Sequence, residues 1–81
     1  MTSAGEIERA LNALATTLGD QRPNSADGAR LQDILDGALG GQRKLAVRVV
    51  DPSRAKVSDI ESGSTIADVE LVDGRWAVSR E

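Results

Sequence analysis

The sequence predicts an α+β fold, in which two N-terminal antiparallel helices pack on one face of a C-terminal antiparallel β-meander of three or four strands. Three observations lead to it. Apolar residues recur at helical spacing through the first half of the chain, apolar and polar residues alternate from Lys44 onwards, and Asp73-Gly74 is a favoured two-residue hairpin turn. The length of 81 residues predicts a single domain, 1–81.

The first helix is predicted at about 4–18. Four apolar residues lie on one of its stripes: Ile7, Leu11, Leu14 and Leu18. Ser3 followed by Glu6 is a capping-box pattern at the start, and Gly19 predicts a left-handed cap at the end. We expect the stripe to face the core; docking on a partner or a second copy is the alternative.

The second helix is predicted at about 27–39. Ser25 or Asp27 is expected to cap its start, and Gly40-Gly41 to end it. Its apolar residues again share one face: Leu31, Ile34, Leu35, Ala38 and Leu39. The short link between the two helices favours an antiparallel pair.

Strands are predicted at about 44–50, 65–72 and 75–80, and Asp51-Pro52 is expected to end the first. If Val72 and Arg75 flank the Asp73-Gly74 turn, Leu71 lies opposite Trp76. In that register the face directed at the helices carries Ala67, Val69, Leu71, Trp76 and Val78, joined by Val47 of the first strand.

Residues 53–62 allow two interpretations. Asp51-Pro52 and Gly63 could begin and end a short helix. The preferred interpretation is a strand at about 55–61, followed by a turn at 62–64. That turn would place Val57 beside Val69 and Ile60 directly across from Ile66.

The composition excludes several classes of protein. The chain has no Cys, His, Tyr or Phe and a single Trp. Disulfides, thiolate metal sites and the commonest general base are therefore missing, and we expect no enzymatic activity and no cofactor. Large aromatic side chains bury the most area, so the predicted core is thin. A thin core leaves room for a partner or a second copy to complete the fold.

The net charge of −3 arises from interspersed acidic and basic residues. Nucleic-acid binders usually carry a basic stripe with stacking aromatics, so no nucleic-acid partner is expected. No apolar run is long enough to span a membrane, and the start of the chain does not resemble a signal peptide. We expect a soluble bacterial or phage protein, cytoplasmic or, if phage-encoded, part of a virion.

Two patterns suggest ligand sites but fit structural roles better. Gly40-Gly41 precedes Lys44, yet these glycines follow a helix, where the dipole is negative, whereas phosphate loops precede one. Acidic residues near 20–28 and 59–63 lack the spacing of a calcium loop and are interpreted as helix caps and turn residues.

The strongest functional hypothesis concerns the second face of the sheet. Four apolar side chains are expected to point away from the helices: Val50, Ile60, Ile66 and Val72. Several apolar residues gathered on a solvent face indicate an interface. We therefore predict that this face, or the free edge of the meander, binds another protein.

The stretch from Ala67 to Ser79, with Asp73-Gly74-Arg75-Trp76 at its turn, resembles the terminal hairpin of NTF2-like domains. That resemblance implies a curved sheet around a ligand pocket, for which this chain is short; no site residue follows from it.

Two functions are thus expected. The first is a non-enzymatic protein-binding or structural module, such as an adaptor, an inhibitor or a virion or assembly component. The alternative is an NTF2-like small-ligand-binding domain completed by dimerisation.

Overall fold

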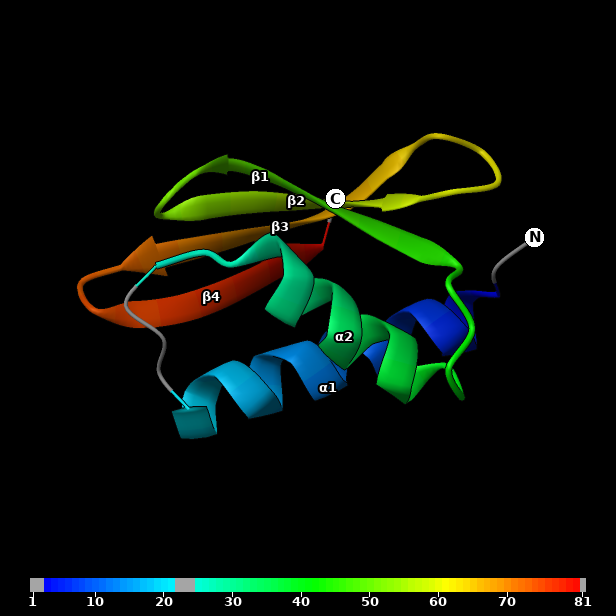
Figure 1. Cartoon of the computed structure of the whole chain (residues 1–81), viewed down its shortest axis with the longest axis horizontal. Helices are drawn as coiled ribbons and strands as arrows, with labels where there is room; N and C mark the ends of the chain where they lie inside the picture. Colours follow the sequence, from blue (N-terminus) through cyan, green and yellow to red (C-terminus); the bar gives the residue numbers. More distant parts are fainter. Residues whose placement is uncertain (1–2, 22–24, 81) are drawn as a thin grey trace.

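The computed structural model describes residues 3–21 and 25–80, and it shows a layer of helices against a layer of strands (Figure 1). Helix α1 spans Ala4–Gln21 and helix α2 spans Gly28–Ala38. The strands are β1 (Leu45–Asp51), β2 (Arg54–Asp59), β3 (Thr65–Val72) and β4 (Arg75–Arg80). They form one antiparallel sheet in chain order, and both helices cover the same face while running in opposite directions. The predicted α+β meander is confirmed, with four strands.

Helix α1 begins as predicted but continues past its predicted end. The Glu6 backbone N–H donates to Ser3 Oγ at 3.2 Å, and the Ser3 N–H donates back to Glu6 Oε1 at 3.4 Å, which is a capping box. The prediction of a cap at Gly19 is wrong, because Gly19 is helical and its φ is not positive. Leu18 is the last buried residue of α1, and the final turn continues into solvent.

Helix α2 is capped at both ends by local chemistry. Asp27 rather than Ser25 caps the start: its carboxylate accepts from the Ala29 and Arg30 N–H groups at 3.1 and 3.4 Å. At the other end, Gly41 N–H donates to Asp36 C=O (2.7 Å) and Gly40 N–H to Gly37 C=O (3.3 Å), a Schellman motif. Both terminal glycines have positive φ, 71° and 83°, so the prediction that Gly40-Gly41 ends the helix is confirmed.

The core lies between the two layers and consists of aliphatic side chains. The largest fully buried ones are Leu14, Leu18, Leu31 and Leu35 from the helices and Leu45, Val57 and Val69 from the sheet. The apolar stripe predicted for the first helix is buried throughout. Trp76, Val78 and Val47 are partly buried against this cluster, on the face predicted for them.

The β3–β4 hairpin has the predicted register. Leu71 pairs with Trp76 and Val69 with Val78. Asp73 and Gly74 both have positive φ, 52° and 75°, as a type I′ turn requires.

Residues 53–62 form β2 and the start of a loop, so the preferred strand is confirmed over the short helix. The predicted register to β3 is wrong by two residues. Val57 pairs with Ala67, not Val69, and Ala55 takes the place beside Val69. The cause is a longer connection: Asp59 N–H donates to Ser64 C=O, Gly63 closes the loop with a φ of 74°, and a bulge follows.

Candidate functional site

The four residues predicted to form a partner-binding face are not gathered into one patch. Val50, Ile60 and Val72 are each about half exposed, at 50%, 49% and 51%. Val50 and Val72 lie at the end of the sheet that holds the β1–β2 and β3–β4 turns, whereas Ile60 lies in the turn after β2 at the opposite end. The fourth residue, Ile66, packs against the core.

A β-bulge explains the position of Ile66. Val57 pairs with Ala67 and Ser58 pairs with Thr65, which leaves Ile66 as the extra residue on β3. A bulge interrupts the strict alternation of side chains between the two faces of a sheet. Ile66 is therefore partly buried with the core, and the predicted cross-strand pair with Ile60 is wrong.

The outer face of the sheet carries ion pairs rather than a continuous apolar surface. Arg54 Nη2 lies 2.8 Å from Glu70 Oε1, and Lys56 Nζ lies 3.7 Å from Asp68 Oδ1. The Glu70 carboxylate accepts hydrogen bonds from Arg54 and raises the pKa of that guanidinium. These pairs link side chains of β2 to side chains of β3. Charged cross-strand pairs of this kind are typical of a sheet face that is exposed to solvent.

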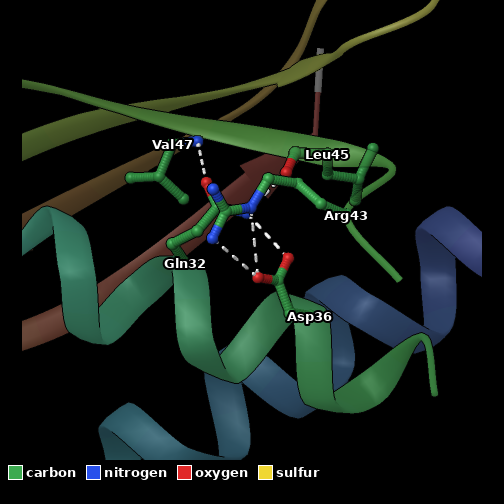
Figure 2. A network of polar contacts seen from close by, with 5 residues as sticks. All are labelled: Gln32, Asp36, Arg43, Leu45 and Val47. Atoms are coloured by element: carbon green, nitrogen blue, oxygen red, sulfur yellow. Dashed lines mark hydrogen bonds and ion pairs between the residues drawn. The ribbon is translucent and has the colours of Figure 1, made fainter. Parts of the chain in front are cut away.

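The two edge strands of the sheet differ in their surroundings, and α2 covers the edge formed by β1. The Gln32 side chain of α2 reaches its backbone: Val47 N–H donates to Gln32 Oε1 at 3.0 Å, and Gln32 Nε2 donates to Leu45 C=O at 2.7 Å (Figure 2). One amide side chain thus satisfies an outward acceptor and an outward donor of β1, as a neighbouring strand would.

A second layer of contacts holds Gln32 in this position. Its Nε2 also donates to Asp36 Oδ1 at 2.8 Å, one turn along α2. Arg43 donates to the other Asp36 oxygen through Nε and Nη2, at 3.3 and 3.2 Å (Figure 2). The start of α2 also approaches this edge, since a Cβ on Gly28 would lie 3.2 Å from Val49 Cγ2. Helix α2 therefore blocks the β1 edge.

Strand β4 forms the other edge of the sheet. In a two-residue hairpin Val72 and Arg75 form the first hydrogen-bonded pair, so Ala77 and Ser79 also bond towards β3. The backbone groups of Val78 and Arg80 consequently point away from the sheet. Within residues 3–21 and 25–80, no side chain bonds to the backbone of Val78 or Arg80.

Two open cavities lie beside this edge, between α1 and β4. Near the start of α1, one of about 300 Å³ is lined by Glu8, Leu11, Asn12, Ala15, Val78 and Arg80. Near the end of α1 a second cavity of about 340 Å³ is lined by Leu18, Gly19, Gly74, Arg75 and Trp76. The α1 residues recur at helical spacing, so one stripe of the helix forms the wall. We refer to the β4 edge and the two cavities together as the β4 groove.

Sequence reasoning named the free edge of the meander but missed the residues of the β4 groove. Glu8, Asn12, Ala15 and Gly19 follow one another at spacings of four, three and four, directly beside the buried stripe. This second stripe is the sequence pattern that could have indicated the site. It contains too few apolar residues to be recognised from hydrophobic periodicity alone.

No protein-family model matches the chain, and no curated protein or solved structure is significantly similar to it. In the part of the chain that the structure describes, no three acidic, His or Cys side chains are grouped to hold a metal ion. None of the described helical segments is long and apolar enough to cross a membrane.

Proposed function

We propose that this protein is a non-enzymatic binding module that takes up an extended segment of a partner protein along β4. The observation that carries the proposal is the asymmetry of the two sheet edges. Helix α2 covers the β1 edge with the Gln32 amide, whereas β4 keeps outward backbone groups at Val78 and Arg80. Proteins usually protect their edge strands, so outward backbone groups at Val78 and Arg80 that no described side chain covers favour use of this edge by a partner.

Strand addition fits the chemistry of this edge. Main-chain hydrogen bonds would supply affinity, and pockets for alternate side chains would supply specificity. The β4 groove has features suited to both roles. The outward backbone N–H and C=O of Val78 could bond to an added strand, and cavities lined by Leu11, Ala15 and Trp76 could accept its side chains. A partner segment would place every second side chain against α1.

The composition supports a binding role over catalysis. The chain has no His, Cys or Tyr, so a nucleophile or base would have to come from carboxylates, lysines or hydroxyls. We propose an adaptor, an inhibitor or a virion or assembly component, of bacterial or phage origin, that acts without cofactor, nucleic acid or membrane. The lack of cysteine favours the cytoplasm, or a virion if the protein is phage-encoded.

A small-ligand-binding domain completed by dimerisation is the second candidate. The cavities of about 300 and 340 Å³ are at the lower limit of small-molecule sites. Both are open to solvent, whereas such sites usually enclose most of their ligand. A thermal-shift screen with small hydrophobic ligands tests this candidate, and a ligand that stabilises the chain would favour it over strand addition.

Two proline variants test strand addition at β4. Val78→Pro removes an outward N–H, which edge strands tolerate, whereas Ser79→Pro removes an N–H that bonds to β3 and serves as the destabilised control. Extended peptides are selected from a random display library on the native chain and then assayed on Val78→Pro. We expect the selected peptides to lose binding to Val78→Pro while its circular dichroism stays native. Peptides that bind both chains equally would refute the proposal.

A further inference from the structure

We propose that Asp73 is a site of spontaneous backbone isomerisation, at which the aspartate converts to isoaspartate through a succinimide. The chain contains three Asp-Gly sequences, Asp27-Gly28, Asp36-Gly37 and Asp73-Gly74. Glycine is the least hindered residue that can follow the aspartate in this reaction, because it has no Cβ. The sequence alone therefore makes the three sites equivalent, and the fold distinguishes them. This inference does not depend on strand addition at β4.

The reaction needs no partner other than water. The Gly74 backbone nitrogen attacks Cγ of the uncharged Asp73 carboxyl group, so that a C–N bond forms and the bond from Cγ to the hydroxyl oxygen breaks. The N–H proton and the hydroxyl leave as water, and a succinimide ring remains. Water then adds to one of the two ring carbonyls. Addition at Cγ restores aspartate, whereas addition at the Asp73 main-chain carbonyl gives isoaspartate, in which the backbone runs through Cβ and Cγ.

The fold restrains both reacting groups at Asp36. Its Oδ1 accepts from Gln32 Nε2 at 2.8 Å, and its Oδ2 accepts from Arg43 Nε and Nη2 at 3.3 and 3.2 Å (Figure 2). The attacking nitrogen would be that of Gly37, which lies inside α2, where backbone N–H groups bond to the preceding turn. The carboxyl group would have to leave its partners and the helix would have to open before this site could react.

Asp27 is restrained because it caps α2. Its carboxylate accepts from the Ala29 and Arg30 N–H groups at 3.1 and 3.4 Å. Gly28 is the first residue of the helix, and it is packed so closely that a Cβ there would lie 3.2 Å from Val49 Cγ2. Turning the Asp27 carboxyl group towards the Gly28 nitrogen would therefore remove the cap from α2.

Asp73 has none of these restraints. Asp73 and Gly74 are both exposed, and within residues 3–21 and 25–80 no group bonds to the Asp73 carboxylate. The flanking pair Val72–Arg75 makes the ladder bonds of a two-residue hairpin, so the Gly74 N–H takes no part in the ladder. Among the described residues, Asp73 is also the one non-glycine residue with a positive φ, 52°. Aspartate adopts that conformation at an energetic cost, which favours departure from the native turn.

Isoaspartate at this position would disrupt the β3–β4 hairpin. It adds a methylene carbon to the main chain of a turn whose type I′ geometry fits two ordinary residues. The turn geometry sets the register of a hairpin, so we expect the pairs Val72–Arg75 and Leu71–Trp76 to open first. Trp76 is partly buried against the core, so its fluorescence should shift to longer wavelength as isoaspartate accumulates.

The modification is measured by incubating the purified chain at mildly acidic pH, where circular dichroism stays native, and digesting samples with trypsin. Cleavage after Lys and Arg places the three Asp-Gly sequences in separate peptides, 10–30, 31–43 and 57–75. Mass spectrometry with backbone fragmentation then locates isoaspartate in each peptide. In the folded chain we expect it to form at Asp73 about tenfold or more faster than at Asp27 or Asp36, the factor that one hydrogen bond to a charged group is worth in a rate. In concentrated urea the three sites should react at similar rates.

Two variants connect the chemistry to the hairpin. Asp73→Asn keeps the preferred type I′ turn and reaches the same succinimide by losing ammonia instead of water, so it should convert faster and show the same Trp76 shift. Asp73→Ser cannot form the ring and should keep its initial fluorescence. Absence of isoaspartate at Asp73 in the folded chain refutes the inference, and so does equal formation at all three sites. A preference for Asp73 that persists in urea would place its cause in the sequence and would refute selection by the fold.

Discussion

Gln32 and Val47 are fifteen residues apart in the sequence, and the Val47 backbone N–H donates to the Gln32 side-chain oxygen at 3.0 Å. With the bond from Gln32 Nε2 to Leu45 C=O, this contact joins α2 to the outward side of β1. A helix side chain here satisfies strand backbone that would otherwise face solvent or another chain. Among the described residues, α2 therefore covers the β1 edge, whereas the outward backbone groups of Val78 and Arg80 on β4 have no side-chain partner.

Gln32→Ala is expected to lower the free energy of unfolding by about 1–3 kcal/mol, because it removes the partners of two part-buried backbone groups. Urea denaturation followed by Trp76 fluorescence measures the change. Gln42→Ala is the matched control, since Gln42 is exposed in the loop after α2 and should change stability by less than about 0.5 kcal/mol. Equal effects of the two substitutions would show that the edge contact contributes nothing.

Asp27→Ala is expected to destabilise the protein by about 1 kcal/mol, because the first turn of α2 loses its side-chain acceptor. Ser25→Ala, two residues earlier and outside the helix, should have little effect. Both are measured by urea denaturation. The sequence left these two residues as alternative caps, and a larger loss in the Ser25 variant would reverse the assignment.

Features that depend on residues close together in the sequence were predicted better than features that depend on contacts between distant residues. The β3–β4 register depends on Asp73-Gly74 and its immediate neighbours, and the caps of α2 depend on residues within one helical turn, so both could be recognised locally. The cap predicted at Gly19 was wrong, because α1 continues through that residue. The bulges at Val50 and Ile66 could not be recognised from neighbouring residues. Each adjusts a strand to its neighbours, and a single extra residue changes the face that a side chain meets.

The candidate site was less predictable for the same reason. The β4 groove exists only because α1, from the start of the chain, lies beside the last strand. Its wall at Asn12, Ala15 and Gly19 has no local pattern typical of a binding site. The covering of β1 likewise depends on Gln32, a residue that resembles any exposed helical glutamine in the sequence.

Stability should decrease at acidic pH partly through Glu6. Its carboxylate accepts a hydrogen bond from Lys44 Nζ and further bonds from Ser3, which hold the pKa of Glu6 below its ordinary value of 4.5. A carboxyl whose pKa is lower in the folded state stabilises the protein above its unfolded pKa, and that contribution is lost as pH falls through the folded pKa. The pKa of Asp51 is also lowered, first by the Ser53 hydroxyl, and its effect has the same sign.

The Glu6 contribution is measured by denaturant unfolding over a pH series that crosses 4.5. The native chain should lose stability below that value, and Glu6→Gln, which keeps the capping-box geometry, should show a smaller loss. Thr16→Ala, an exposed position on the same helix without a titratable group, is the control and should retain the native pH dependence. Identical curves for the native chain and Glu6→Gln would exclude the contribution of this carboxylate.

Ile66→Asp and Val72→Asp together test the assignment of the two sheet faces. Ile66 packs against the core at the β3 bulge, so an aspartate there would place a carboxylate among aliphatic side chains, and we expect a loss of about 2–4 kcal/mol. Val72 is half exposed at the end of the same strand, and its replacement should cost about 1 kcal/mol or less, within the range of strand propensity. Urea denaturation with circular dichroism measures both. If Ile66→Asp instead keeps native stability, its side chain faces solvent, and the apolar outer face predicted from the sequence returns as the rival of the β4 groove for partner binding.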